Sequence, residues 1–86
     1  MLLKLSSPEY QPDFMEIINQ FFPVNEEHNE IIEIDYHFEN DTIFAHIKIE
    51  NDGLKEYDYK EKQNEYQSQK TILKHMLYKA LSSYKK

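Results

Sequence analysis

Cysteine and arginine are both absent from the 86 residues of this chain, and each absence excludes a kind of site. Without cysteine, the chain can form no disulfide, thiolate nucleophile, cysteine-bound zinc site or iron–sulfur cluster. Without arginine, it lacks the planar side chain that binds phosphate or carboxylate through two parallel hydrogen bonds. Proteins without disulfides are typical of a reducing compartment, so we expect a cytoplasmic location.

Long apolar runs and an excess of basic residues are missing too. No segment approaches the about 20 apolar residues that cross a membrane, and MLLKLSSPEY at the start is too short for a signal peptide, so we expect no membrane contact. Residues 1–59 carry 14 acids and 3 lysines, whereas residues 60–86 carry 7 lysines and 2 acids. The net charge of −6 disfavours nucleic acid as a partner. The length predicts one small domain over residues 1–86.

The first third of the chain predicts a strand followed by a helix. MLLKL, residues 1–5, is a short apolar run that Ser7-Pro8 ends. In QPDFMEIINQFFP, residues 11–23, Pro12 suits the first helical turn, Pro23 suits the end, and apolar residues recur on one helix face, namely Phe14, Ile17, Ile18 and Phe21. The polar segment VNEEHNE, residues 24–30, is interpreted as a connection in which His28 needs no metal.

Two alternating segments predict a hairpin. EIIEIDYHFE, residues 30–39, and TIFAHIKIE, residues 42–50, place apolar side chains at every second position. Only Asn40-Asp41 lies between them, which is the length of a two-residue hairpin loop. That loop pairs every inward residue with another apolar one: Phe38 with Ile43, Tyr36 with Ala45, Ile34 with Ile47, and Ile32 with Ile49.

The next turn contains the only glycine in the chain. A two-residue loop at Asp52-Gly53 would place Glu56 opposite Ile49 and bury its carboxylate. A three-residue loop over residues 51–53, with Gly53 in the left-handed conformation of a G1 bulge, avoids this burial. The longer loop pairs Ile47 with Tyr57 and Ala45 with Tyr59 on the inner face, and Lys48 with Glu56 and His46 with Asp58 on the outer face.

The last segment, residues 63–86, predicts a long helix with Asn64 as its N-cap. Its apolar stripe consists of Tyr66, Leu73, Met76, Leu77, Ala80, Leu81 and Tyr84 with Ile72 beside it. The predicted order is therefore β-α-β-β-β-α. We expect an α+β fold, a two-layer sandwich whose mainly antiparallel sheet carries both helices on one face.

The outer face of the predicted sheet places His46 between Asp35 and Asp58, with His37 diagonally across. A histidine between carboxylates resembles the oriented base of a catalytic triad or a weak metal site. No nucleophile or charge stabiliser stands at a matching spacing, so we interpret the group as cross-strand charge pairing and assign no catalytic, cofactor-binding or metal-ligating residue.

Phe44 is an aromatic residue among the charges of that face, opposite His37. We predict an interaction surface formed by Phe44, Ile31, His46 and His37, for a protein partner or a second copy of the chain. Incidental exposure of Phe44 is the alternative. The order α-β-β-β-α also suits a double-stranded-RNA-binding domain, but that domain needs a lysine cluster where this chain carries Glu61 and Glu65.

IINQFFP, residues 17–23, and ILKHMLYKALSSY, residues 72–84, resemble the N-terminal region of bacterial HemZ-type coproporphyrinogen dehydrogenases, which are radical-SAM proteins similar to oxygen-independent coproporphyrinogen III oxidase. In that family a first helix closes in Phe-Phe-Pro, and a later helix carries a pattern like Leu77-Tyr78, Leu81-Ser82 and Tyr84. The resemblance implies an accessory domain of an oxidoreductase of haem biosynthesis, whose [4Fe–4S] cluster and S-adenosylmethionine are held elsewhere in the parent protein.

The family continues with a Thr-Gly-Lys, a Pro-Trp-Gly run and a three-cysteine motif, none of which this chain contains. No catalytic residue therefore transfers, and the chain alone is expected to have no enzymatic activity and no cofactor. Two hypotheses remain open. The chain is a non-catalytic accessory domain that aids substrate or partner recognition by the catalytic remainder of its own protein, or it is a free-standing interaction module that uses the open sheet face.

Overall fold

The computed structural model describes residues 2–22 and 29–86, and within them the element order confirms the predicted α+β fold. Pro23 and most of the predicted connection, including His28, lie outside these residues. The elements are β1 (Leu2–Leu5), a short 3-10 helix η1 (Pro8–Tyr10), α1 (Gln11–Phe21), β2 (Ile31–Glu39), β3 (Thr42–Glu50), β4 (Leu54–Lys62) and α2 (Gln69–Tyr84).

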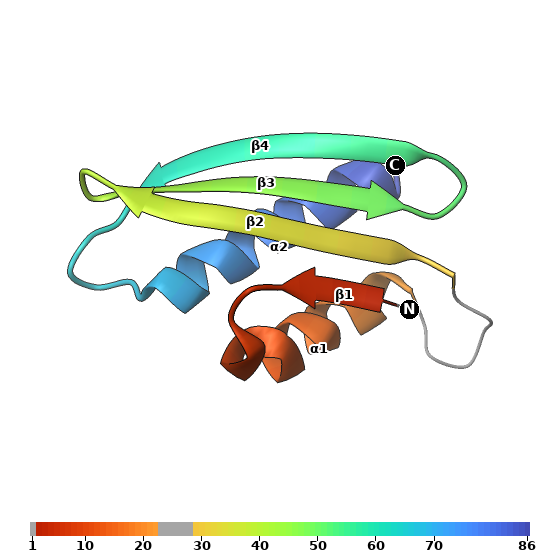
Figure 1. The fold of residues 1–86 in the computed structure, drawn as a ribbon, viewed down its shortest axis with the longest axis horizontal. Helices are drawn as coiled ribbons and strands as arrows, with labels where there is room; N and C mark the ends of the chain where they lie inside the picture. The colour runs from red at the N-terminus through yellow and green to blue at the C-terminus, as the bar shows by residue number, and fades with distance from the viewer. Residues whose placement is uncertain (1, 23–28) are drawn as a thin grey trace.

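The four strands form one sheet in the order β1-β2-β3-β4. The strand β1 pairs with β2 in parallel, and the other neighbours are antiparallel. Both helices lie on the same side of the sheet, in agreement with the prediction (Figure 1). A parallel β1–β2 pair follows from this arrangement, because α1 crosses back over the sheet between the two strands.

The first hairpin has the predicted two-residue loop and register. Phe38 pairs with Ile43 and Ile34 pairs with Ile47. Asn40 and Asp41 have φ values of 51° and 61°, the left-handed values that a type I′ turn requires. Asparagine and aspartate tolerate this conformation better than most residues, which is why this dipeptide can close the hairpin.

The second hairpin has the predicted three-residue loop, and Ile47 pairs with Tyr57 as expected. The conformation predicted for Gly53 is wrong in detail: its φ of 153° is positive but far from the left-handed helical value of about 57°. The cause is a tertiary contact. The Tyr84 hydroxyl on α2 donates to the Gly53 carbonyl at 2.8 Å and accepts from the Asn51 amide at 3.0 Å, so α2 shapes the turn.

The second helix begins later than predicted, because Ser68 is its N-cap. Thr71 N–H donates to Ser68 Oγ at 3.1 Å. Asn64 instead closes a local turn, since its Oδ1 accepts from Tyr66 N–H at 2.8 Å. Tyr66 therefore precedes the helix and is 88% exposed, so its place in the predicted apolar stripe is wrong.

The core fills the space between the sheet and the helices. It consists of Phe14, Ile17, Ile18, Phe22, Ile32, Ile34, Ile43, Ala45, Ile47, Ile49, Ile72, Leu73, Met76, Leu77, Ala80 and Leu81. Phe38 pairs as predicted on the inward side, yet it is 50% exposed. Figure 1 shows β2 extending past the start of α1 toward the hairpin, so α1 does not cover this end of the strand. In the described part of the chain, no helix is long and apolar enough to cross a membrane.

Candidate functional site

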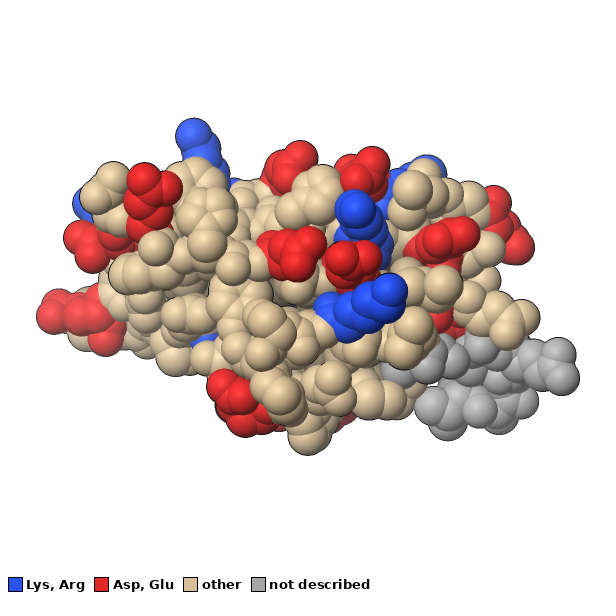
Figure 2. Space-filling view, viewed as in Figure 1, with Lys and Arg blue, Asp and Glu red and all other residues tan. Residues whose placement is uncertain are grey.

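The outer face of the sheet, defined by the side chains that point away from the helices, carries ordered rows of residues across the strands. One row alternates in charge and consists of Lys4, Glu33, Lys48 and Glu56. The next row contains Asp35, His46 and Asp58, and the one beyond it contains His37, Phe44 and Lys60. Figure 2 shows acidic and basic side chains together across the middle of this face, with a largely uncharged area toward the β2–β3 hairpin.

His46 is held by two carboxylates of β4. Its Nδ1 lies 2.5 Å from Asp58 Oδ1, and its Nε2 lies 3.0 Å from Glu56 Oε1. Because carboxylates only accept hydrogen bonds, both ring nitrogens can donate only when the ring is protonated. The hydrogen bonds to Asp58 and then to Glu56 raise the pKa of His46 above 6.5, against a smaller opposing effect of burial. The geometry therefore favours the imidazolium.

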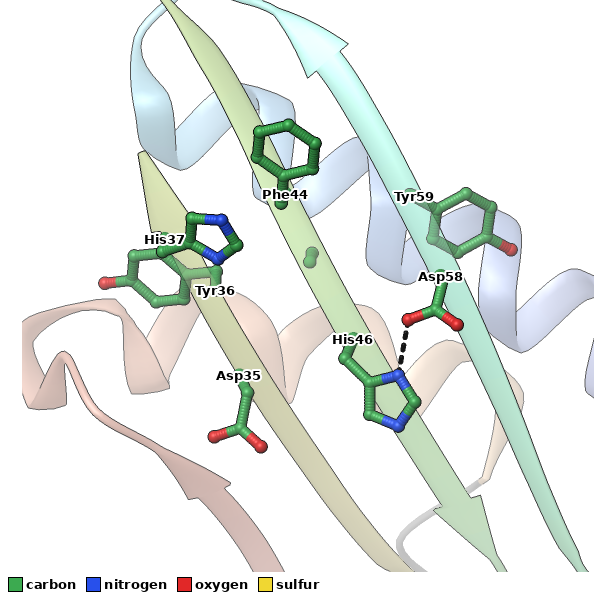
Figure 3. Close-up of a pocket in the computed structure, with 8 residues that line it drawn as sticks. Asp35, Tyr36, His37, Phe44, His46, Asp58 and Tyr59 are labelled. Carbon is green, nitrogen blue, oxygen red and sulfur yellow. Dashed lines mark hydrogen bonds and ion pairs between the residues drawn. The ribbon is translucent and has the colours of Figure 1, made fainter. Parts of the chain in front are cut away.

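This pairing differs in part from the prediction. Asp58 is a partner of His46 as expected, and Figure 3 shows Asp35 without a contact to the ring. The second partner is Glu56. Glu56 also lies 4.0 Å from Lys48, which confirms that predicted cross-strand pair. Sequence reasoning missed Glu56 as a partner of His46 because it considered only the residues directly opposite the histidine. Glu56 lies diagonally across from His46, two residues before Asp58 on β4.

Phe44 and His37 form the apolar side of the site. Their rings stack with centroids 4.8 Å apart and planes 9° apart. Together with Asp35, His46 and Asp58 they line an open hollow of about 320 Å³, to which Tyr36, Ala45 and Tyr59 also contribute. We call this the His37–Phe44 hollow. Figure 3 shows the two stacked rings from β2 and β3 on one side of it and the His46–Asp58 pair on the other.

Ile31 does not join this group. It lies six residues before His37 on β2, about 20 Å away at the rise of an extended strand, and the charged row with Glu33 separates the two. Its neighbour on β1 is Leu2, which is 50% exposed. The structure thus brings Phe44, His37 and His46 together and places Ile31 in a separate apolar patch near the end of the sheet. Sequence reasoning missed Leu2, since no sequence pattern indicates that β1 pairs with β2.

The residues that line the hollow offer aromatic, charged and hydrogen-bonding groups through which a partner can bind. No group of three or more His, Asp or Glu side chains within the described residues is arranged to hold a metal ion. The imidazole of His46 has no serine or threonine hydroxyl beside it among its hydrogen-bond partners, which are both carboxylates. The sequence also offers no thiolate for the [4Fe–4S] cluster of the resembling family, so the residues of this chain do not fit that group.

Partial burial raises the pKa values of Tyr57 and Tyr59 above 10, so both phenols are neutral at physiological pH. The Tyr59 ring lies on the inner face of the sheet, where Lys79 Nζ is 5.3 Å from its centroid, so the charge at the hollow comes from Asp35, Asp58 and His46.

Comparisons with protein family models, with curated proteins and with solved structures found no match to this chain.

Proposed function

We propose that this chain is a non-catalytic accessory domain that binds a protein surface through the His37–Phe44 hollow. The observation that carries the proposal is the outer face, which no helix of the described residues covers, since α1 and α2 both pack on the opposite side of the sheet (Figure 1). Stacked aromatic rings at an open concave site are the kind of group that supplies most of the binding energy in protein interfaces.

The charges around the hollow indicate what the partner presents. In the described structure the Asp35 carboxylate makes no ion pair or hydrogen bond, and the His46 ring is turned toward Asp58 and Glu56 instead. A partner that places an apolar side chain against Phe44 and a lysine or arginine near Asp35 would match this side of the hollow. The net charge of −6 favours approach of a basic surface in the same way.

The resemblance to HemZ-type coproporphyrinogen dehydrogenases suggests the partner: the catalytic part of such a radical-SAM protein, in haem biosynthesis. The two segments that carry the resemblance contact each other in the structure. Phe21 lies against Tyr78 with ring centroids 5.3 Å apart, and Phe22 lies 6.4 Å from Tyr84. The two short motifs that carry the resemblance are thus far apart in the chain but form one contact between α1 and α2.

Calorimetric titration of this chain with the separately produced catalytic part of a HemZ-type protein tests the proposal. Phe44→Asp should weaken binding at least about tenfold, a loss of about 1.4 kcal/mol that is usual for a central aromatic contact. Met15→Asp is the matched control, because Met15 is 37% exposed on α1, which lies on the other side of the sheet. Equal affinities of the two variants would contradict the site, and absence of binding by the wild type would contradict the partner.

The alternative, a free-standing interaction module, rests on the same open face. The reading frame that encodes this chain separates the two. A frame that continues past Lys86 into a cysteine-bearing barrel supports the accessory domain, whereas a stop codon directly after Lys86 supports the free-standing module.

A further inference from the structure

The strand β4 is an edge strand of the sheet, because it is the last in the strand order (Figure 1). It is nine residues long, and its open edge is unpaired in the described structure. Such an edge presents free backbone N–H and C=O groups that another strand can pair with. Gln63 N–H donates to the Asp41 carbonyl at 2.8 Å, which indicates that odd-numbered residues of this segment direct their backbone groups toward β3. The backbone groups of Glu56, Asp58 and Lys60 therefore point to the open edge.

The sequence of β4, LKEYDYKEK, places lysines and glutamates at equal distances on either side of Asp58, so the strand is complementary in charge to a second copy that runs antiparallel to it. When a second copy of β4 is placed antiparallel to the first, with a two-fold axis at Asp58, all nine residues pair. The pairs across the two copies are Leu54 with Lys62, Lys55 with Glu61, Glu56 with Lys60, and Tyr57 with Tyr59, and the axis generates each of them twice. Four pairs of opposite charge and two tyrosine pairs result, each a stabilising kind of cross-strand contact.

We propose that two copies of this chain associate through antiparallel pairing of their β4 strands about Asp58, which joins the two sheets into one of eight strands. The axis at Asp58 is the one that pairs all nine residues. Axes at Tyr57 and at Tyr59 each leave two residues of each β4 unpaired, and the axis at Tyr57 also places Glu56 opposite Asp58. The axis at Tyr59 gives four opposite-charge pairs but places Tyr57 opposite Glu61. Isologous contacts of this kind close after two copies, so the association stops at a dimer.

One like-charge contact lies on the axis, where Asp58 meets Asp58 of the second copy. In each copy the Asp58 carboxylate is 2.5 Å from His46 Nδ1 of its own chain, so each of these carboxylates already has a hydrogen-bond partner. On the inner face, Tyr57 and Tyr59 of one copy stack at 6.4 Å with planes 10° apart, and the two pairs from the two copies would form a continuous row.

The pairing leaves the His37–Phe44 hollow free. Because outer-face residues pair only with outer-face residues, the two-fold axis is perpendicular to the sheet and both outer faces lie on the same side. The dimer would present two copies of the hollow to a partner, so this inference goes beyond the proposed function and does not depend on it.

Analytical ultracentrifugation of the whole chain and its charge-reversed variants tests the proposal. Since one edge contact is smaller than a standard interface, we expect a dissociation constant of about 10–100 µM for the wild type. Lys60→Glu places a glutamate opposite Glu56 of the second copy, and Glu56→Lys places a lysine opposite Lys60. Each variant alone should dimerise at least about tenfold more weakly. An equimolar mixture of the two variants restores both pairs and should dimerise as the wild type does.

Circular dichroism spectra of each variant show whether it is folded. Glu33→Lys, a charge reversal of the same kind on β2 away from the edge, is the matched control and should dimerise like the wild type. A wild type that stays monomeric at about 1 mM would overturn the proposal. Single variants that dimerise as tightly as the wild type would also overturn it. A mixture whose dimerisation stays weak would do the same, since restored dimerisation requires the Glu56–Lys60 register. Phe44→Asp should still dimerise, which separates this outcome from that of the proposed function.

Discussion

Replacing His46 with glutamine removes the imidazolium that holds Glu56 and Asp58 on β4, while keeping a polar side chain of similar length. Glutamine cannot carry charge, so the variant loses the attraction to both carboxylates. Exposed cross-strand pairs of opposite charge contribute about 0.2–1 kcal/mol each. Asp58 is 81% exposed and Glu56 49% exposed, and solvent weakens both contacts. We therefore expect the two contacts together to contribute about 1 kcal/mol to the free energy of unfolding.

The pH dependence of that contribution has a definite sign. The pKa of His46 is raised above 6.5 in the folded protein by its hydrogen bonds to Asp58 and Glu56. A raised pKa means that the folded state holds the proton more tightly than the unfolded state. The stabilisation is therefore fully present below pH 6.5 and is lost as pH rises through the folded pKa.

Urea unfolding of the wild type and His46→Gln at about pH 5.5 and about pH 8.5 measures this effect. The wild type should be more stable than the variant by about 1 kcal/mol at the lower pH, with a melting temperature about 4–8 °C higher, and the difference should shrink at the higher pH. His75→Gln is the matched control, because His75 is exposed on α2. An equal difference between wild type and His46→Gln at both pH values would refute the reasoning, as would an equal effect of His75→Gln.

Three further predictions test the fold by urea or thermal unfolding, and one of them has a control variant read by the far-UV spectrum. Ile47→Ala deletes a fully buried side chain at the centre of β3 and should lower the free energy of unfolding by about 2–5 kcal/mol; a loss under about 1 kcal/mol would contradict the assigned core. Ser68→Ala removes the acceptor for Thr71 N–H and should cost about 1 kcal/mol, whereas Asn64→Ala should leave the helix content of the far-UV spectrum unchanged. Gly53→Ala should cost about 1–3 kcal/mol through backbone strain alone, because a side chain there meets nothing within 4 Å; a neutral effect would exclude the positive φ.

The two hairpins are predictable because the alternation of apolar and polar residues and the length of each loop together fix the strand register. A register shift of one residue would turn every isoleucine of β3 to solvent, so apolar pairing leaves one arrangement for each loop length. That constraint is sufficient to pair His46 with Asp58 and Lys48 with Glu56 from residue order alone. The start of α2 is not predictable in the same way, because Asn64 and Ser68 are both good N-caps and their local preferences do not distinguish them.

The amino-acid sequence by itself determined the strand faces, both hairpin registers and the absence of thiolate chemistry, because these depend on period, loop length and residue type alone. Only the tertiary structure decided which carboxylates His46 contacts, since Asp35, Asp58 and Glu56 are all within reach of one ring and the side-chain conformation selects among them. It also decided the shape of the Gly53 turn, through a hydroxyl on α2 that is 31 residues away in the chain. Finally, it left β4 as an open edge, which follows from the position of β1 on the other side of the sheet.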